Sequence, residues 1–597
     1  MIIRDICFSI NNEFNSQIRR QNMSMRTVVA VLSVFAISPC FARTITVDDN
    51  GPADFNNIQA AINDSVNGDT VIVQPGTYTG DGNRDIDFMG KVITLRSSNG
   101  PKECIINCED SYRHRGFYFH SSEQADSIVD GFTIMRGRAS VMIQGGAYGG
   151  GIYCSGSSPT IRNCIITLNK SYYPGTAMGG GIYCTAGSTA SFVGCTISNN
   201  EALGSNSGDF GLPGDPAYGG GIYSSSPSCN PVLENCVIVN NLVRGGNGFG
   251  GSAGGEAYGG GVYGRASLSN CTVSGNSAQG GSGNVGYGGG LYSTGTVVQN
   301  SIFWDNSAVI GLEISGSATV SYSDVKGGWA GSGNINTNPF FADFYYGDYH
   351  LQTAAGRWDP NTKVWIHDIN TSPCVDAGDP NSAWTKELWP NGKRINMGAY
   401  GGTPEASMSL STVGNIANLD NDPCDFIDYN DLKIFAEKWC FEKHLLAEDL
   451  DRDGNVDFND FAIFGEQYFL THPVEEPCEP GIIFTISQCE QGMSKTGAYE
   501  LMDSTRFTIT VNGRYIHFED MMVGNCCTPL ANLRVEMTVN SNVVTIYEHE
   551  QLPQYPCTCI CDYPVDADAG PFESGTYTLT VYEDYGGLIG STTFTIN

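Results

Sequence analysis

The stretch Gly149-Gly150-Gly151-Ile152-Tyr153 decides the fold, because it returns four more times along the chain with at most one substitution. The later copies begin at Gly179, Gly219, Gly259 and Gly288, so the intervals between copies are 30, 40, 40 and 29 residues. A period of this size is typical of stacked repeats, in which each repeat packs only on its neighbours. Because the segments are short, β-branched and bounded by Gly, Ser and Asn, the sequence predicts a β-solenoid.

A second element follows each copy and ends a few residues later at an asparagine. Stacked coils place equivalent residues about 4.8 Å apart, so these positions predict an inward file of small apolar side chains and a ladder of amides at a turn. The residues expected in the inward file are Cys164, Cys195, Cys236 and Cys271. The residues expected in the ladder are Asn169, Asn199, Asn240, Asn276 and Asn306.

The segments on either side of the repeats complete this picture. Residues 55–65 have apolar side chains at helical spacing and are expected to cover the open end of the first coil. With Ile58-Gln59-Ala60-Ala61-Ile62 and Pro75-Gly76-Thr77-Tyr78, residues 44–404 resemble a right-handed parallel β-helix of the pectate-lyase-like class. The repeats themselves resemble those of polymorphic outer-membrane proteins, and residues 372–379 and 396–402 are similar to the end of such β-helices in exported bacterial proteins. The resemblance implies a β-helix domain over residues 43–405.

Charge and the N-terminal segment limit the partners and the compartment. The 597 residues carry 31 basic and 63 acidic side chains, a net charge of −32, which excludes the basic footprint that nucleic acid or an anionic membrane needs. Arg19, Arg20 and Arg26 precede an apolar run over residues 28–37, which predicts a signal peptide over residues 1–42 with cleavage near Ala42. No later stretch is apolar for long enough to span a membrane. We therefore expect a secreted protein.

An acidic loop after the β-helix has the ligand spacing of a Ca²⁺ site. Its oxygen donors occupy loop positions 1, 3, 5, 7, 9 and 12, and Gly454 occupies the sharp turn at position 6. A second loop fits the same spacing if two residues are inserted near Pro423, because the ungapped alternative would place Cys424 among the ligands of a hard cation. The residues predicted for the first loop are Asp449, Asp451, Asp453, Asn455, Asp457 and Asp460. Those for the second are Asn418, Asp420, Asp422, Asp428 and Asp431.

The two loops, each followed by a helix-like segment, resemble a type I dockerin over residues 414–472. That resemblance implies two bound Ca²⁺ ions, an EF-hand-like helical domain and docking onto a cohesin-like protein, typically in polysaccharide-degrading systems. The positions that the family uses for partner choice are Tyr429-Asn430 and Phe458-Asn459 instead of Ser-Thr, so the sequence does not identify the partner protein. A purely structural Ca²⁺ clip between two β modules is the alternative.

The β-helix offers little for catalysis. Residues 141–300 hold nine charged residues and no histidine, and no two carboxylates there have the strand spacing that glycan hydrolysis would need. The best substrate-facing cluster lies on the early coils, with a solvated rim as the alternative reading; its residues are Arg113, His114, Arg115, Arg136 and Arg138. Tyrosines of the Gly-rich loops either stack on sugar rings or pack within the loops; they are Tyr148, Tyr172, Tyr173, Tyr218, Tyr258 and Tyr287.

Residues 478–597 alternate polar and apolar positions in short runs, which predicts a C-terminal β-sandwich. This domain also holds two cysteine clusters that form disulfides or bind a soft metal, and export favours the disulfides; the cysteines are Cys526, Cys527, Cys557, Cys559 and Cys561.

Together, these features predict a mainly β, secreted, multidomain protein. Its β-helix would bind a glycan or a protein at the cell surface, and the Ca²⁺-dependent module would attach it to a partner. The alternative is a polysaccharide lyase or glycoside hydrolase on the same scaffold, acting in polysaccharide catabolism.

Overall fold

The chain forms two compact units, Met1–Ile416 with Cys440–Asp457, and Ala417–Trp439 with Phe458–Asn597. Each unit is treated separately below. The computed structural model describes residues 42–139, 146–172, 175–208, 210–225, 227–411, 416–419, 427, 429–441, 443–468, 481–486, 508–512, 515–525, 533–540, 543–550, 560–570, 575–583 and 587–596. The predicted signal peptide lies outside these residues, apart from its last position.

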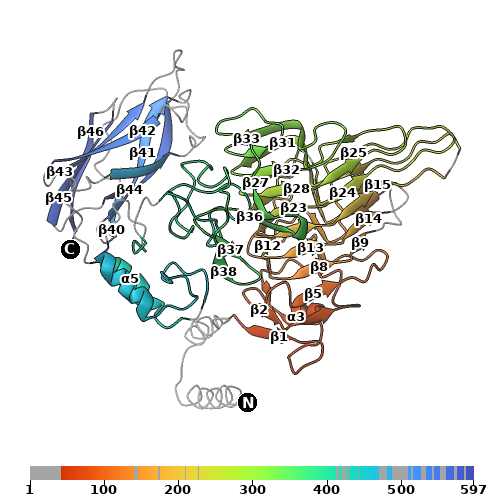
Figure 1. Cartoon of the computed structure of the whole chain (residues 1–597), viewed down its shortest axis with the longest axis horizontal. Helices are drawn as coiled ribbons and strands as arrows, with labels where there is room; N and C mark the ends of the chain where they lie inside the picture. Colours follow the sequence, from red (N-terminus) through yellow and green to blue (C-terminus); the bar gives the residue numbers. More distant parts are fainter. Residues whose placement is uncertain are drawn as a thin grey trace, which may run out of the picture. The chain divides into compact units, whose positions relative to one another are not determined.

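The first unit is a parallel β-helix whose coils stack along one axis (Figure 1). A 15-stranded sheet, sheet A, forms one wall from two rows of strands that the long strand β31 (Leu291–Gln299) joins. The first row is β1 (Thr44–Val47), β2 (Thr70–Val73), β4 (Thr94–Ser97), β7 (Ile128–Asp130), β12 (Thr160–Arg162), β17 (Ser191–Val193), β22 (Val232–Glu234) and β27 (Ser267–Ser269). The second row is β6 (Phe117–Phe119), β11 (Ile152–Ser155), β16 (Ile182–Thr185), β21 (Ile222–Ser224) and β26 (Val262–Gly264), and β33 (Ile314–Ser321) pairs with β31.

Sheet B forms the opposite wall of the main core. Its nine strands are β3 (Gly76–Tyr78), β5 (Cys104–Asn107), β8 (Thr133–Met135), β13 (Ile165–Thr167), β18 (Thr196–Ser198), β23 (Val237–Val239), β28 (Thr272–Ser274), β32 (Ile302–Trp304) and β34 (Asp324–Val325). Isoleucine, valine, phenylalanine and cysteine side chains from both sheets fill the space between them. Burial of these side chains is the main stabilising contribution to the stack.

Two smaller parallel sheets form a second, thinner lobe. Sheet C is β9 (Arg138–Ala139), β14 (Lys170–Tyr172), β19 (Glu201–Leu203), β24 (Leu242–Arg244) and β29 (Ser277–Gln279). Sheet D is β10 (Gly146–Tyr148), β15 (Thr176–Met178), β20 (Ala217–Tyr218), β25 (Ala257–Tyr258) and β30 (Gly286–Tyr287). Between them lies a core made almost entirely of alanine, so the two sheets approach closely; it contains Ala177, Ala202, Ala217, Val243, Ala257 and Ala278.

The three consecutive glycines of each repeat form the waist between the two lobes. A Cβ atom on Gly220, the middle glycine of its triplet, would lie 2.4 Å from the carbonyl oxygen of Gly260 and 2.6 Å from the carbonyl carbon of Leu242. A Cβ on the third glycine, Gly221, would lie 3.1 Å from the amide carbon of Asn241. Glycine is therefore required at these positions. The backbone of the triplet passes between a neighbouring coil, a strand of sheet C and a buried amide, which leaves no room for a Cβ atom.

The buried amides form the predicted ladder, but with two corrections. In register along the stack, each ladder asparagine donates Nδ2–H to Oδ1 of the next at 2.9–3.0 Å, and the members are Asn169, Asn200, Asn241, Asn276 and Asn306. The predicted Asn199 and Asn240 are instead the turn residues just before the ladder, with φ of +54° and +56°. The last amide, Asn306, donates to the carboxylate of Glu313, which ends the ladder. The predicted file of four cysteines is confirmed as fully buried.

Two segments close the ends of the stack. Helix α3 (Ile58–Asp64), capped by the Asn57 side chain, contacts β1 and β2 as expected for a cover over the first coil. After β34 the chain forms β35 (Phe341–Asp343), the 3-10 helix η1 (Phe344–Tyr346), β36 (Asp348–Leu351), β37 (Arg357–Asp359) and β38 (Val364–Ile366). Residues 338–411, the closing segment, pack on sheet B: Asn235 donates to the carbonyl oxygens of Ala399 and Gly401 at 2.9 and 2.7 Å.

Glycine-rich loops between sheets C and D project from the thin lobe as a fin (Figure 1). The fin comprises the described parts of residues 204–216, 245–256 and 280–285. Its loops bond laterally through their backbones, as in the 3.0 Å bond from the Gly211 N–H to the Phe249 carbonyl oxygen. A Cβ on Gly246 would lie 1.8 Å from the Ser205 carbonyl oxygen, so the loops pack backbone against backbone.

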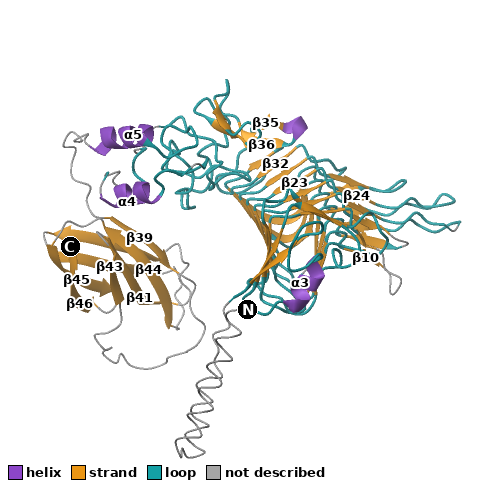
Figure 2. Cartoon of the chain, turned by 90° about the horizontal axis from the view of Figure 1, so that it is seen from below, coloured by secondary structure: helices purple, strands orange, loops and turns teal. Residues whose placement is uncertain are grey.

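The second unit contains helices and strands that pair antiparallel, except for β43 (Val543–Glu550) and β45 (Gly575–Glu583), which pair in parallel (Figure 2). Helices α4 (Tyr429–Glu437) and α5 (Phe458–Tyr468) each include the last acidic loop position in the first turn. Two four-stranded sheets follow. One is β39 (Gly481–Ile486), β44 (Ile560–Gly570), β41 (Tyr515–Asn525) and β40 (Thr508–Asn512); the other is β42 (Leu533–Asn540), β43 (Val543–Glu550), β45 (Gly575–Glu583) and β46 (Gly587–Ile596). The dockerin-like domain, the sandwich and the domain boundaries stay predictions.

No helix among the residues given above is long and apolar enough to cross a membrane.

Candidate functional site

Two rows of tyrosine side chains line the outer face of the β-helix where sheets A and D meet. Parallel register carries each ring to the position above the last, as in the pairing of Tyr183 with Tyr223. Neighbouring rings of the first row lie 5.0–5.4 Å apart between centroids, and the row is Tyr118, Tyr153, Tyr183, Tyr223, Tyr263 and Tyr292. The second row is Tyr148, Tyr218, Tyr258 and Tyr287, with Met178 in register between the first two.

The two rows touch each other and form one aromatic strip, called the tyrosine double row below. Tyr218 packs edge to face on Tyr263 at 5.0 Å, and Tyr258 packs in the same way on Tyr292 at 5.0 Å. Except for Tyr183, which is buried, the rings are half-buried, so one part of each is fixed by its neighbours and another part faces solvent. Burial raises the pKa of Tyr183 to about 12, so this phenol stays neutral at ordinary pH.

Charged side chains lie at the N-terminal end of the tyrosine double row. The guanidinium of Arg115 lies 4.9 Å from the ring centre of Tyr153 and 5.3 Å from that of Tyr118, within cation–π range. The His120 ring packs on Tyr118 at 4.1 Å. Burial lowers the pKa of Arg115, although the charge of Asp85 acts in the opposite direction.

The structure brings most of the predicted substrate cluster together. His114 Nδ1 lies 2.5 Å from Asp85 Oδ2, and the Arg115 N–H donates to the other oxygen of Asp85. Arg138 donates its backbone N–H to the His114 carbonyl oxygen, and Arg113 donates to that of Arg138.

The side chains of two predicted arginines contact residues other than His114 and Asp85. The Arg138 guanidinium lies 3.8 Å from the centre of Tyr112, and Arg136 Nε is 4.0 Å from Asp110. Asp85, which orients His114, was missed because the sequence gives no reason to join residues about 30 positions apart. The assignment of a substrate to this cluster stays a prediction.

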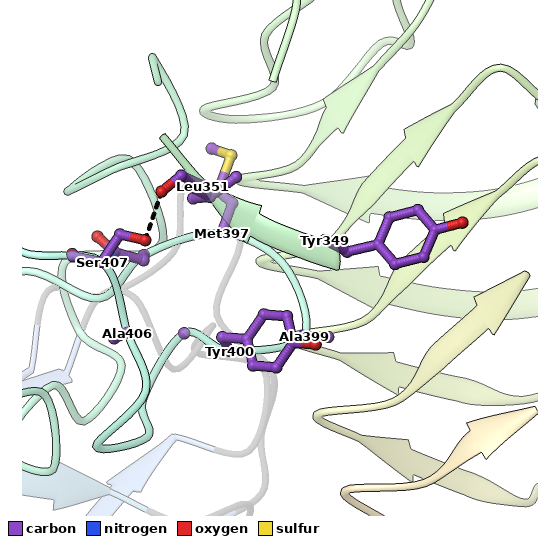
Figure 3. A pocket seen from close by; sticks show the side chains of 9 residues that line it. Tyr349, Leu351, Met397, Ala399, Tyr400, Ala406 and Ser407 are labelled. Atoms are coloured by element: carbon purple, nitrogen blue, oxygen red, sulfur yellow. Dashed lines mark hydrogen bonds between the residues drawn. The ribbon is translucent and has the colours of Figure 1, made fainter. Parts of the chain in front are cut away.

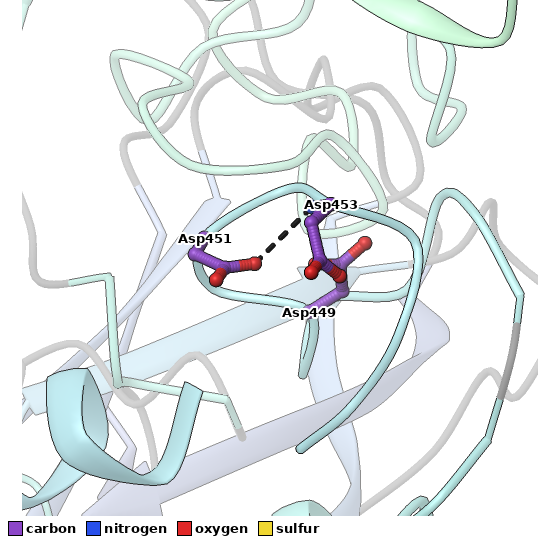
Figure 4. A group of neighbouring side chains, drawn as sticks. All are labelled: Asp449, Asp451 and Asp453. Carbon is purple, nitrogen blue, oxygen red and sulfur yellow. Dashed lines mark hydrogen bonds between the residues drawn. The ribbon is translucent and has the colours of Figure 1, made fainter. Parts of the chain in front are cut away.

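The first acidic loop has the geometry of a cation site (Figure 4). One oxygen from each of Asp449, Asp451 and Asp453 lies within 4.8 Å of the others. Gly454 at φ +97° makes the turn and donates its N–H to Asp449 Oδ2 at 2.9 Å. Asn455 donates its N–H to Asp453 Oδ1 at 2.8 Å. Clustered carboxylate oxygens on a tight turn are the donor set that Ca²⁺ prefers, so these residues fit a hard cation.

The remaining predicted ligands are only partly described. Asp457 is half-exposed. In the second unit, Asp431 and Asp460 are fully buried in the first turns of α4 and α5, and Asp431 accepts the Leu419 N–H at 2.6 Å. Asn418 is also buried. Asp420, Asp422 and Asp428 lie outside the described residues, as do Tyr173, the cysteines 526, 527, 557 and 559, and the side chain of Cys561.

A small cavity in the closing segment is too small for a substrate (Figure 3). Its volume is about 10 Å³, room for one water molecule. Tyr349, Tyr400 and Met397 line it, and Ser407 Oγ donates to the Leu351 carbonyl oxygen at its wall. This cavity therefore belongs to the packing of the closing segment.

Buried carboxyl groups near the end of the stack predict a pH-dependent stability. Burial raises the pKa of Glu313 from 4.5 to about 7 and that of Asp324 from 3.8 to about 6. A carboxyl whose pKa is higher in the folded state binds its proton more tightly there. Its stabilising contribution is complete below the unfolded pKa and is lost as the pH rises through the folded pKa.

We expect the β-helix to lose stability between about pH 5 and pH 8, with about 3 kcal/mol arising from Glu313. Denaturant unfolding followed at both pH values measures the loss. Glu313→Gln should keep an acceptor for Asn306 and reduce the slope by the Glu313 contribution, whereas Gln at the exposed Glu103 should leave it unchanged. An unaltered slope in Glu313→Gln would contradict the assignment.

Comparison with known proteins was made at three levels. A family model described as a right-handed β-helix region matches residues 79–302, and one described as disaggregatase-related matches residues 268–378. The crystal structure of pectate lyase Pel9A is similar over 60% of this chain and 96% of its own, at 18% identity and a TM-score of 0.28. A comparison with curated proteins gave no match. The first unit is thus a right-handed parallel β-helix.

Proposed function

We propose that the β-helix binds an extended polysaccharide along the tyrosine double row, and that the chain is secreted and attached to a partner through a Ca²⁺-dependent, dockerin-like module. The observation that carries the proposal is the double row itself. Its rings repeat at 5.0–5.4 Å along one direction, are fixed by contacts with one another, and remain partly exposed. Pyranose rings present C–H faces that stack on aromatic rings, and a linear glycan repeats in one direction as the rows do.

The charge of the chain supports a glycan over other extended polymers. A net charge of −32 disfavours nucleic acid, which also stacks on aromatic rings but needs basic side chains along its backbone. Within residues 146–172, 175–208, 210–225 and 227–300, the basic residues are Arg162, Lys170, Arg244 and Arg265, and Arg162 and Lys170 are paired with Asp130 and Glu201.

Replacing one ring in the middle of the double row tests the binding surface. We expect Tyr223→Ala to weaken binding about tenfold, because losing one stacking contact costs on the order of 1 kcal/mol. Tyr223→Phe should keep most of the affinity. Tyr346→Ala is the matched control, since Tyr346 is 91% exposed and lies on η1, outside the double row. Affinity electrophoresis and calorimetry with mannan, xylan, galactan and polygalacturonate provide the measurement. The proposal fails if none of these binds, or if Tyr223→Ala binds as well as the control.

The catalytic alternative rests on one observation, the contact of His114 with Asp85 beside Arg115 at the end of the double row. A base held in this way could remove a proton from a bound sugar. The same polysaccharides, assayed for unsaturated products and for new reducing ends, separate the two functions. Under the binding proposal neither product appears, whereas product that disappears in His114→Ala or Arg138→Ala would establish the enzyme.

Removal of Ca²⁺ tests the attachment module. We expect chelation to destabilise residues 414–472, because a ligand that binds only the folded state contributes about 2.7 kcal/mol at a hundred times its dissociation constant. Calorimetric titration of the chelated chain with Ca²⁺ should show that Asp449→Ala binds fewer ions than the unmodified chain. Asp81→Ala is the control, since that side chain is 92% exposed and lies on the β-helix. Equal Ca²⁺ binding by both variants would rule out the site.

A further inference from the structure

The closing segment buries a carboxyl group of which only one oxygen accepts hydrogen bonds. The Glu387 side chain is 4% exposed. Its Oε1 accepts the Asn396 N–H at 2.8 Å and the Gly402 N–H at 2.7 Å. Its Oε2 is equally buried and has no hydrogen-bond partner. Leaving such an oxygen unsatisfied destabilises the folded state, and more so when the oxygen is charged, so the site calls for a further group.

A second carboxyl group nearby also has one buried oxygen without a hydrogen-bond partner. Asp376 Oδ2 accepts the Ser409 hydroxyl, whereas its Oδ1 is buried and has no partner. The Asp376 N–H donates to Asn396 Oδ1 at 2.7 Å, and Asn396 in turn donates its N–H to Glu387. One buried asparagine therefore bonds both the backbone of Asp376 and the carboxyl group of Glu387.

Two residues near the Asp376 carboxylate have a left-handed backbone conformation. Asp376 has a φ of +52°, an unfavourable conformation for a residue with a side chain. Gly392 has a φ of +59°, and a Cβ on it would lie 2.4 Å from Asp376 Oδ2. The glycine therefore lets the main chain approach the carboxylate directly.

Among the residues that the structure describes, no cationic side chain bonds either of the two unsatisfied oxygens. Arg394 is close enough to act on Asp376, but its guanidinium donates to the carbonyl oxygens of Gly378 and Ala377 at 2.7 and 3.1 Å. Burial raises the pKa of Glu387 to about 8, a value to which the charge of Asp376 also contributes. A single shared proton would leave one negative charge buried, whereas a divalent cation would neutralise both carboxylates and bond both unsatisfied oxygens.

We propose that Asp376 and Glu387 bind a hard divalent cation inside the closing segment, with Asp376 Oδ1 and Glu387 Oε2 as its protein ligands. Oxygen ligands of this kind suit Ca²⁺, and water or backbone carbonyls complete its coordination. The site lies away from the acidic loops in sequence and does not depend on the proposed function. Its role is structural, since it fixes the segment that packs on sheet B.

Counting bound Ca²⁺ in the full chain tests the site. A loop-silenced chain carries Asp449→Ala and Asp431→Ala, two substitutions that lie outside the closing segment. After chelation and dialysis, calorimetry with Ca²⁺ should still show one bound ion in this chain. Tb³⁺ should replace that ion and emit under tryptophan excitation, because Trp389 is two residues from Glu387.

Variants of the site complete the test. Glu387→Gln and Asp376→Asn, each in the loop-silenced chain, should abolish both signals. Glu313→Gln, which alters a buried carboxyl group that bonds Asn306 through both oxygens, should abolish neither. The proposal is overturned if the loop-silenced chain is folded by circular dichroism and binds no Ca²⁺, or if Asp376→Asn binds as much as Glu313→Gln. Loss of the loop sites alone would show instead as fewer ions in the loop-silenced chain than in the unmodified one.

Discussion

Gly220→Ala is expected to prevent the β-helix from folding or to destabilise it by at least about 3 kcal/mol. The added Cβ would lie 2.4 Å from the Gly260 carbonyl oxygen on one side and 2.6 Å from backbone atoms of Leu242 on the other. Both obstacles are backbone atoms of neighbouring strands or coils, so no side chain can rotate away. The Gly220 N–H also bonds the Gly259 carbonyl oxygen at 3.0 Å, which holds the coils in place.

Equilibrium unfolding in denaturant measures this effect, and Gly208→Ala provides the control. Gly208 lies in a loop of the fin, and a Cβ there would meet nothing within 4 Å. We expect that variant to differ from the unmodified chain by no more than about 0.5 kcal/mol. Similar stability of the two alanine variants would mean that the triplets are not selected by close packing.

The second large effect is expected for Asn241→Ala, at about 4 kcal/mol. The Asn241 side chain is 1% exposed and makes four hydrogen bonds. It accepts two from Asn200 at 3.0 Å, donates to the Ile197 carbonyl oxygen at 2.8 Å, and donates to Asn276 at 2.9 Å. Alanine would remove all four bonds, leave the buried Asn200 N–H without its acceptor, and divide the side-chain ladder into two shorter pieces.

The adjacent residue gives a control that differs by one position. Asn240 is exposed and has a φ of +56°, a conformation that glycine adopts without strain. Asn240→Gly should therefore change stability by less than about 0.5 kcal/mol. Thermal unfolding of the two variants separates the positions, and an equal loss in both would contradict the ladder assignment.

The contrast between these neighbours shows what the sequence could and could not predict. The repeat predicted stacked β coils and the buried cysteine file, because both follow from periodicity alone. The ladder position was misassigned at Asn199 and Asn240, where two asparagines are adjacent and either could face inward. A signal was present, since every ladder residue lies five positions after its Cys or Ser, as Asn200 does after Cys195.

Features that depend on contacts between distant coils could not be predicted in this way. The tyrosine of each Gly-Gly-Gly-Ile-Tyr copy was visible as a repeat, but its contact with the loop tyrosines arises only when the triplet folds sheet D against sheet A. The thin alanine lobe was missed for a related reason. Its strands are two or three residues long, too short for an alternating pattern to be recognised. The raised pKa values of Glu313 and Glu387 depend on the burial of their side chains, which the sequence does not show.

The fin has a consequence for how this chain can change in evolution. Its loops satisfy their backbone groups on one another, as Gly254 does through its 2.7 Å bond to the Ser282 carbonyl oxygen. A deletion in one loop would leave unpaired donors and acceptors on its neighbours. We therefore expect a change of length in one loop to be tolerated only when the loops beside it change with it.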